Sequence, residues 1–237
     1  MDLINKIYNI DCLEGLKQME SCSVDVTFTS PPYNDSSTKS NSVANERKDK
    51  STHTKYITLE DHSKDWFEWQ CSVIDELLRV SKKSVIYNIQ ALANNRENVW
   101  KLFGHYADKI HHVLIWDKDN VIPAGRGIVS NQYEFIIIFD TNINNKITAN
   151  SNFFTNIIHA PKNKDKTYSN IHKAVMSKPL ADIIIKEFTK EGDLVLDPFM
   201  GLGTTALSCI DNNRKWCGFE LAPLYYEKCL ERIKNYT

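Results

Sequence analysis

Several features that would assign a protein to a broad class are missing from this 237-residue sequence. No uninterrupted apolar run approaches the roughly 20 residues of a membrane-spanning helix, and the first ten residues, MDLINKIYNI, lack the cationic stretch and apolar core of a signal peptide. Basic and acidic residues nearly balance, at 29 and 30, so no global positive charge indicates a nucleic-acid partner. We therefore expect a cytoplasmic protein with no membrane partner, in which any contact with a polyanion depends on a local basic patch.

Metal-binding and disulfide patterns are also missing. The six cysteines, at positions 12, 22, 71, 209, 217 and 229, form no C-x-x-C pair and have no histidine at a spacing that suits zinc. His111 and His112 begin a predicted strand, where local hydrogen bonds are favoured over metal binding. The sequence therefore predicts reduced thiols and no metal site.

What is present is an alternation of short β-rich segments and longer amphipathic segments, which predicts an α/β fold with helices on both faces of one sheet. We expect one domain over residues 1–237. Seven strands are expected at residues 6–10, 24–28, 84–89, 111–116, 133–139, 194–197 and 216–220. Helices are expected at residues 13–19, 66–81, 93–103, 179–190, 204–212 and 223–235.

Two segments have no periodic pattern. Residues 34–65 are almost entirely polar and longer than a compact domain normally tolerates in a loop without a function, which predicts a mobile loop over the active site. Residues 140–172 are rich in Asn and Lys, and the window HAPKNKDKTYSNIHK, residues 159–173, is the most basic of the chain. We interpret residues 140–172 as a short target-recognition segment, with a solvated linker as the alternative.

The stretch DLVLDPFMGLGTTALSC, residues 193–209, combines an apolar strand, an acid, two glycines and a helix. Gly201 and Gly203 let the backbone approach a ligand closely, and a strand end beside a helix start is the usual binding crevice of an open α/β sheet. Ala206 replaces the third glycine of a dinucleotide fingerprint, and Asp197 would repel a pyrophosphate. About 20 residues on, Glu220 can accept hydrogen bonds from ribose hydroxyls. A nucleoside-like cofactor with a positive amino-acid moiety is therefore favoured over a plain tight turn.

The segment TSPPYN, residues 29–34, follows the predicted strand VDVTF directly. The Ser30 hydroxyl and the Pro31 carbonyl can each accept a hydrogen bond from an exocyclic amine, while the prolines are rigid and offer no competing N–H. Tyr33 offers a face on which a base can stack. Since a base inside a duplex cannot reach such a pocket, the base would have to flip out of the helix.

These two motifs in this order, TSPPYN and far downstream DPFMGLGTT, resemble the S-adenosylmethionine-dependent amino-methyltransferases of DNA in their beta group, whose circularly permuted order places the catalytic motif before the cofactor motif. The resemblance spans nearly the whole chain. It implies the class I methyltransferase fold with a seven-stranded, mixed, mostly parallel sheet, S-adenosyl-L-methionine as the cofactor and double-stranded DNA as the substrate. Matched residue by residue, the resemblance assigns a catalytic set of Ser30, Pro31, Pro32 and Tyr33, and a cofactor-binding set of Asp11, Cys12, Lys178, Asp197, Pro198, Phe199, Gly201, Gly203, Thr204, Thr205 and Glu220.

The target base is less sharply indicated. Many adenine-modifying members of the family carry Asp at the position of Ser30, and His followed by Pro where this chain has His172 and Lys173. Serine therefore favours cytosine N4, with adenine N6 as the alternative. We expect the phosphates of DNA to be contacted by the lysines of the basic window, Lys162, Lys164, Lys166 and Lys173. The resemblance also implies a cognate restriction endonuclease in the same system. Relatives often dimerise, and the sequence does not decide between a monomer and a homodimer.

Rival functions explain less of the sequence. RNA and protein-glutamine amino-methyltransferases use a similar Pro-Pro-Tyr segment, but usually with Asn first and with the cofactor motif before it. A nicotinamide oxidoreductase would leave residues 30–33 without a purpose, and a non-catalytic DNA-binding protein would explain the basic window alone. Cytosine C5 methylation needs a cysteine nucleophile, and the chain contains no Pro-Cys dipeptide.

Overall fold

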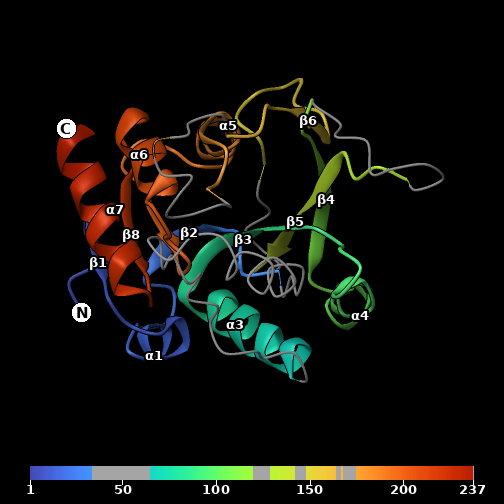
Figure 1. Ribbon diagram of the computed structural model, residues 1–237, viewed down its shortest axis with the longest axis horizontal. Helices are drawn as coiled ribbons and strands as arrows, with labels where there is room; N and C mark the ends of the chain where they lie inside the picture. The colour runs from blue at the N-terminus through green and yellow to red at the C-terminus, as the bar shows by residue number, and fades with distance from the viewer. Residues whose placement is uncertain (34–64, 120–128, 142–147, 164–166, 168–174, 237) are drawn as a thin grey trace, which may run out of the picture.

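Strands and helices alternate along the chain in the computed structural model, which describes residues 1–33, 65–119, 129–141, 148–163, 167 and 175–236 (Figure 1). The strands are β1 (Lys6–Tyr8), β2 (Val24–Thr29), β3 (Ser81–Ile89), β4 (Ile110–Asp117), β5 (Tyr133–Asp140), β6 (Ile157–His159), β7 (Leu194–Asp197) and β8 (Lys215–Phe219). The helices are α1 (Cys12–Lys17), α3 (Trp66–Val80), α4 (Arg96–His105), α5 (Lys178–Phe188), α6 (Thr204–Asp211) and α7 (Pro223–Tyr236).

The strands form one sheet in the order β1-β8-β7-β2-β3-β5-β4-β6. β5 runs antiparallel to both of its neighbours, and the remaining pairings between described strands are parallel. The mixed, mostly parallel sheet is thus confirmed, but the expected number of seven strands is wrong, because the described residues form eight. The additional strand, β6, is three residues long and pairs with β4 at the edge of the sheet, so it has no alternating pattern by which the sequence could reveal it.

Helices cover both faces of the sheet, as expected. One apolar core lies between the sheet and α1, α3 and α4, and a second lies between the sheet and α5, α6 and α7. One apolar stripe of α3 is buried: Val73, Ile74, Leu77 and Val80 have no exposed surface. Burial of such a stripe is what stabilises an amphipathic helix on a sheet.

All six cysteines are free thiols, as the sequence predicts, and four of them are buried: Cys12, Cys209, Cys217 and Cys229. Within the described ranges, no helix has both the length and the apolar composition needed to cross a bilayer.

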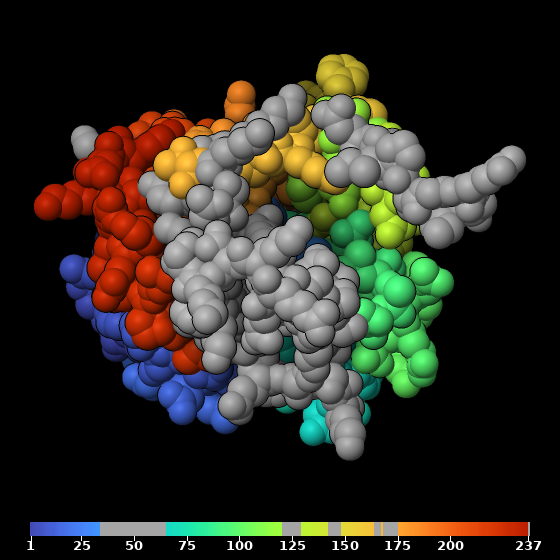
Figure 2. All heavy atoms as spheres, viewed as in Figure 1, coloured from blue at the N-terminus to red at the C-terminus, as the bar shows by residue number. Residues whose placement is uncertain are grey.

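The sheet topology brings the two sequence motifs together. β2 and β7 are parallel neighbours, with Val26 opposite Val195 and Thr27 opposite Leu196. Their carboxyl ends therefore lie at the same edge of the sheet, where Ser30 follows β2 and the glycine turn follows β7. In open α/β sheets this edge is where ligands bind. Figure 2 shows the molecule as spheres in the same view as Figure 1, with α6 and α7 in orange and red on one side and α4 in green on the other.

Candidate active site

The turn between β7 and α6 depends on its glycines. Gly201 has a φ of +53° and Gly203 a φ of +79°, which is the left-handed region that other residues adopt only with strain. A Cβ atom on Gly203 would also lie 2.7 Å from the Sγ atom of Cys229 on α7. Both the backbone and the packing against α7 thus require glycine at position 203.

Asp197, at the end of β7, connects this turn to the segment that holds Ser30. Its side chain is 3% exposed, and its carboxylate accepts hydrogen bonds from Thr29 Oγ1 at 2.7 Å, Thr205 Oγ1 at 2.6 Å and the Phe199 N–H at 3.1 Å. Burial raises the pKa of Asp197, and the hydrogen bonds from Thr205 and Thr29 oppose this rise. The carboxylate therefore ties β2, β7 and the first turn of α6 to one another.

Glu220, which follows β8, holds the same turn from the other side. Its two carboxylate oxygens accept hydrogen bonds from the Gly201 N–H at 2.8 Å and the Ala222 N–H at 2.9 Å. Burial of the side chain raises the pKa of Glu220. Each oxygen has a second lone pair, so the carboxylate can still accept hydrogen bonds from a ligand.

The other residues assigned to the cofactor are distributed over several elements. Asp11 caps α1 by accepting hydrogen bonds from the backbone N–H groups of residues 13 and 14, and Cys12 behind it is buried. Burial also raises the pKa of the Cys12 thiol. Phe199 packs its ring against Trp69, with 5.7 Å between centroids. Pro198 lies between Asp197 and Phe199 in the turn.

Thr204 and Thr205 form the first turn of α6, and both are buried. Lys178 lies elsewhere. Its ammonium group forms ion pairs with Asp182 of α5 and with Asp211 at the last residue of α6, whereas the glycine turn precedes the first residue of that helix. The structure therefore does not bring Lys178 together with the glycine turn.

The residues of the proline-containing segment end β2 abruptly. Pro31 is buried, and the carbonyl of the exposed Pro32 accepts a hydrogen bond from Trp66 Nε1 at 3.3 Å. Ser30 directs its side chain toward β3, where its Oγ lies 2.8 Å from the Tyr33 hydroxyl and 3.3 Å from Asn88 Nδ2. The serine hydroxyl thus joins a polar cluster at the carboxyl edge of the sheet.

This cluster includes an ion pair that the sequence did not reveal. Lys118, just after β4, places its Nζ 2.8 Å from Glu134 Oε1 on β5, and the two residues are only 4% and 8% exposed. The second oxygen of Glu134 accepts hydrogen bonds from the Tyr33 hydroxyl at 2.8 Å and Asn88 Nδ2 at 2.7 Å. One signal was available, because Glu134 is the one charged residue in the otherwise apolar or aromatic run YEFIIIF.

Comparison with known proteins identifies the family. The model of the DNA methylase family, which covers N6 and N4 methyltransferases, matches residues 24–231 of this chain. These residues include Ser30 and the whole glycine turn. The chain belongs to the DNA methylase family. This member is 27% identical over 273 residues to the type II methyltransferase M.BamHI of Bacillus amyloliquefaciens, covering 98% of the chain and 57% of the relative. It is 24% identical over 267 residues to M.BglII of Bacillus subtilis, covering 94% of the chain and 67% of the relative.

Solved structures show the same fold. The cytosine-N4-specific PvuII DNA methyltransferase superposes with a TM-score of 0.72 at 17% identity, covering 99% of this chain and 94% of the neighbour. A candidate DNA modification methylase from Thermus thermophilus, solved with S-adenosyl-L-methionine, superposes with a TM-score of 0.70 at 20% identity, covering 98% of this chain and 94% of the neighbour.

The expected DNA-binding parts of this DNA methylase family member are only partly described. Lys162 lies in the described range and is partly buried, whereas Lys164, Lys166 and Lys173 lie outside it. The expected target-recognition segment contains β6, and the expected mobile loop lies outside the described residues except for Asp65.

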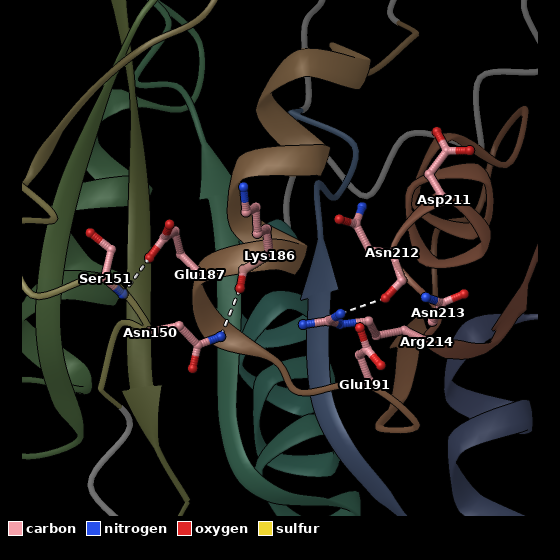
Figure 3. Close-up of a pocket in the computed structure, with 9 residues that line it drawn as sticks. All are labelled: Asn150, Ser151, Lys186, Glu187, Glu191, Asp211, Asn212, Asn213 and Arg214. Carbon is pink, nitrogen blue, oxygen red and sulfur yellow. Dashed lines mark hydrogen bonds between the residues drawn. The ribbon is translucent and has the colours of Figure 1, made fainter.

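The described residues form two further polar sites. A depression of 470 Å³ is formed by the C-terminal ends of α5 and α6 and the residues that precede β7 and β8, so it opens at the opposite edge of the sheet from the glycine turn (Figure 3). The second site is formed by Asp117, Asp119 and His159, whose potential metal ligands lie within 4.8 Å of one another. His159 Nδ1 lies 3.2 Å from a carboxylate oxygen of Asp117 and 3.6 Å from one of Asp119.

Proposed function

We propose that this protein is a site-specific DNA methyltransferase that transfers a methyl group to the exocyclic amine of a flipped-out base, with cytosine N4 as the target and adenine N6 as the alternative. The observation that carries the proposal is the hydrogen bond between Thr29 and Asp197. It fixes Ser30, the next residue, beside the glycine turn. The proposed amine acceptor and the proposed cofactor crevice would thus share one edge of the sheet.

The turn fits S-adenosyl-L-methionine as the cofactor. Gly201 and Gly203 lack a Cβ and adopt left-handed backbone conformations, so the main chain can approach a ligand. Glu220 has spare acceptor capacity for ribose hydroxyls, and the partly buried Phe199 offers an apolar ring beside the turn. When bound, S-adenosyl-L-methionine supplies the methyl group.

The amine needs acceptors because its lone pair is conjugated with the base and is a poor nucleophile. Ser30 Oγ and the Pro31 carbonyl would hold the two N–H bonds so that the lone pair turns away from the ring plane. Tyr33 would contribute a stacking face to the flipped base. Asp197 and Thr205 would act indirectly, by fixing the turn relative to Ser30.

One observation supports cytosine N4 over adenine N6. The chain carries serine where many adenine-modifying members of the family carry aspartate. The two relatives described above are type II methyltransferases, which supports a role beside a cognate restriction endonuclease. This chain spans 57% of the length of M.BamHI and 67% of the length of M.BglII.

The test is to incubate the purified protein with duplex DNA and labelled S-adenosyl-L-methionine, and then to sequence the DNA by a method that separates N4-methylcytosine from N6-methyladenine. The proposal requires label on DNA at an exocyclic amine. Ser30→Ala should lower kcat by about 100-fold, comparable to removal of one transition-state hydrogen bond, and leave cofactor affinity unchanged. Gly201→Val should abolish cofactor binding itself. Absence of label with the wild-type protein would refute the proposed function.

A further inference from the structure

A chain of hydrogen bonds runs from the buried Lys118–Glu134 ion pair to the Ser30 hydroxyl. Lys118 Nζ donates to Glu134 Oε1, the Tyr33 hydroxyl lies 2.8 Å from Glu134 Oε2, and Ser30 Oγ lies 2.8 Å from the Tyr33 hydroxyl. A hydroxyl can donate or accept, so the contact between serine and tyrosine has two possible directions. Which direction holds decides whether Ser30 presents a proton or a lone pair to a ligand.

The carboxylate settles this direction. An ionised carboxylate can only accept, and its 2.8 Å contact with the Tyr33 hydroxyl is shorter than the 3.3 Å contact of that hydroxyl with the Asn88 carbonyl, so the single phenolic proton goes to Glu134. Burial and the charge of Glu134 raise the pKa of Tyr33 well above its ordinary value, which keeps that proton on the phenol at neutral pH. Because the Tyr33 proton points to Glu134, the Tyr33 oxygen accepts from Ser30, and the Ser30 proton points away from the ligand side.

Asn88 supports the same direction from β3. Its Nδ2 lies 2.6 Å from the Tyr33 oxygen and 2.7 Å from Glu134 Oε2. The opposite orientation of this amide would place its carbonyl oxygen 2.7 Å from a carboxylate oxygen, which is repulsive, so the amide group donates. The Tyr33 oxygen therefore accepts from both Asn88 and Ser30, and both of its lone pairs are used.

We propose that Glu134, held by Lys118, is a positioning residue that sets the direction of the Ser30 hydroxyl, so that this hydroxyl presents its lone pairs to the target amine. The inference rests on the proposed function and adds to it the group that makes serine an acceptor. An exocyclic amine approaches with its N–H bonds, and a serine proton pointing outward would oppose it. Aspartate, which many adenine-modifying relatives carry at this position, only accepts and needs no such control.

The first test is Glu134→Gln, which keeps the shape of the side chain. Its amide can donate to the Tyr33 oxygen, which frees the phenolic proton to turn to Ser30 and the serine proton to turn outward. We expect kcat for DNA methylation to fall by about 10- to 100-fold, while calorimetric affinity for S-adenosyl-L-methionine and the KM for DNA stay unchanged. Glu97→Gln, on the exposed face of α4, is the matched control and should keep wild-type kcat.

A double-mutant cycle separates this role from a purely structural one. Tyr33→Phe interrupts the chain, so it should lower kcat, and Glu134→Gln should cost nothing further in that background. In the Ser30→Asp background, Glu134→Gln should leave kcat unchanged or raise it. The new carboxylate at position 30 has no proton to orient, and its repulsion by the Glu134 carboxylate is removed. Losses from Tyr33→Phe and Glu134→Gln that multiply would overturn the proposal.

A second variant is the control for a loss of folding. If Glu134→Gln unfolds because Lys118 loses its partner, Lys118→Met combined with Glu134→Gln removes both charges and tests the same direction. Folded variants with wild-type kcat would refute the positioning role while DNA methylation by the wild-type protein stands. Failure of the wild-type protein to methylate DNA would instead refute the proposed function, so the two failures are distinguishable.

Discussion

Replacement of Asp197 tests whether this buried carboxylate joins the two motifs. Thr29 and Thr205 donate to it with side chains that are 0% and 1% exposed, and the Phe199 N–H is the third donor. We compare Asp197→Ala, which removes every acceptor, with Asp197→Asn, which keeps the shape and one carbonyl oxygen.

The magnitude follows from the donors left unpaired. A buried donor without a partner costs about 1–3 kcal/mol, so two buried hydroxyls put the cost of Asp197→Ala at about 2–6 kcal/mol of unfolding free energy. In Asp197→Asn the carbonyl oxygen can keep the bonds from Thr29 and Phe199, the Thr205 hydroxyl can turn to accept from the amide, and the buried charge disappears. We therefore expect Asp197→Asn to cost about 1 kcal/mol or less.

The assay is urea unfolding at neutral pH, followed by tryptophan fluorescence, with the free energy extrapolated to water. Equal free energies for the two variants, with equal slopes, would show that the hydroxyls do not depend on the carboxylate and would refute the reasoning.

The raised pKa of Asp197 also predicts a pH dependence of stability, measured on the wild type and Asp197→Asn. Because burial raises the pKa of Asp197 in the folded chain above its unfolded value of about 3.9, the folded state binds this proton more tightly. The stabilisation is fully present below the unfolded pKa and is lost as the pH rises through the raised folded pKa. Wild-type protein should therefore lose stability relative to Asp197→Asn as the pH rises from about 4, and a constant difference would contradict the assignment.

Three further changes have specific outcomes. Gly203→Ala should cost about 2–4 kcal/mol in urea unfolding, from backbone strain and the contact with Cys229, and Cys229→Ala in the same chain should recover the contact part alone. Lys118→Met should cost about 3–5 kcal/mol, because it leaves Glu134 buried and unpaired, and adding Glu134→Gln should recover most of that cost. Lys162→Ala should reduce the slope of log affinity for DNA against log salt by about 1, and an unchanged slope would remove Lys162 from the DNA contacts.

The regular part of the fold was predictable because burial imposes a period on the sequence. The apolar stripe of α3 recurs every three or four residues, and the helix observed at Trp66–Val80 differs from the predicted one by a single residue. All seven predicted strands are present, because their β-branched and aromatic runs are flanked by polar turns. β6 could not be found in this way, since its three residues gain their structure from pairing with β4 and not from a local pattern.

The candidate site was only half predictable. Ser30 and the glycine turn lie in contiguous motifs, so the sequence alone predicts a role for each of them. Lys118 and Glu134 are brought together by the antiparallel pairing of β4 with β5, which places Trp116 opposite Glu134, and no local pattern encodes that register. Tyr33 was expected to offer its ring face to a base, whereas its hydroxyl bonds to Glu134, which the pairing of β5 with β3 brings near.

The bond between Thr29 and Asp197 also has a consequence for how the protein is made. Its partners are 168 residues apart in the chain, and β1 at the start pairs with β8, which is synthesised later still. At translation rates of about 5–20 residues per second, the Ser30 segment leaves the ribosome roughly 10 to 30 s before the carboxylate that anchors it. A nascent chain therefore carries the Ser30 segment through most of its synthesis without the carboxylate that holds it beside the glycine turn, and the proposed site assembles only when the last quarter of the chain has emerged.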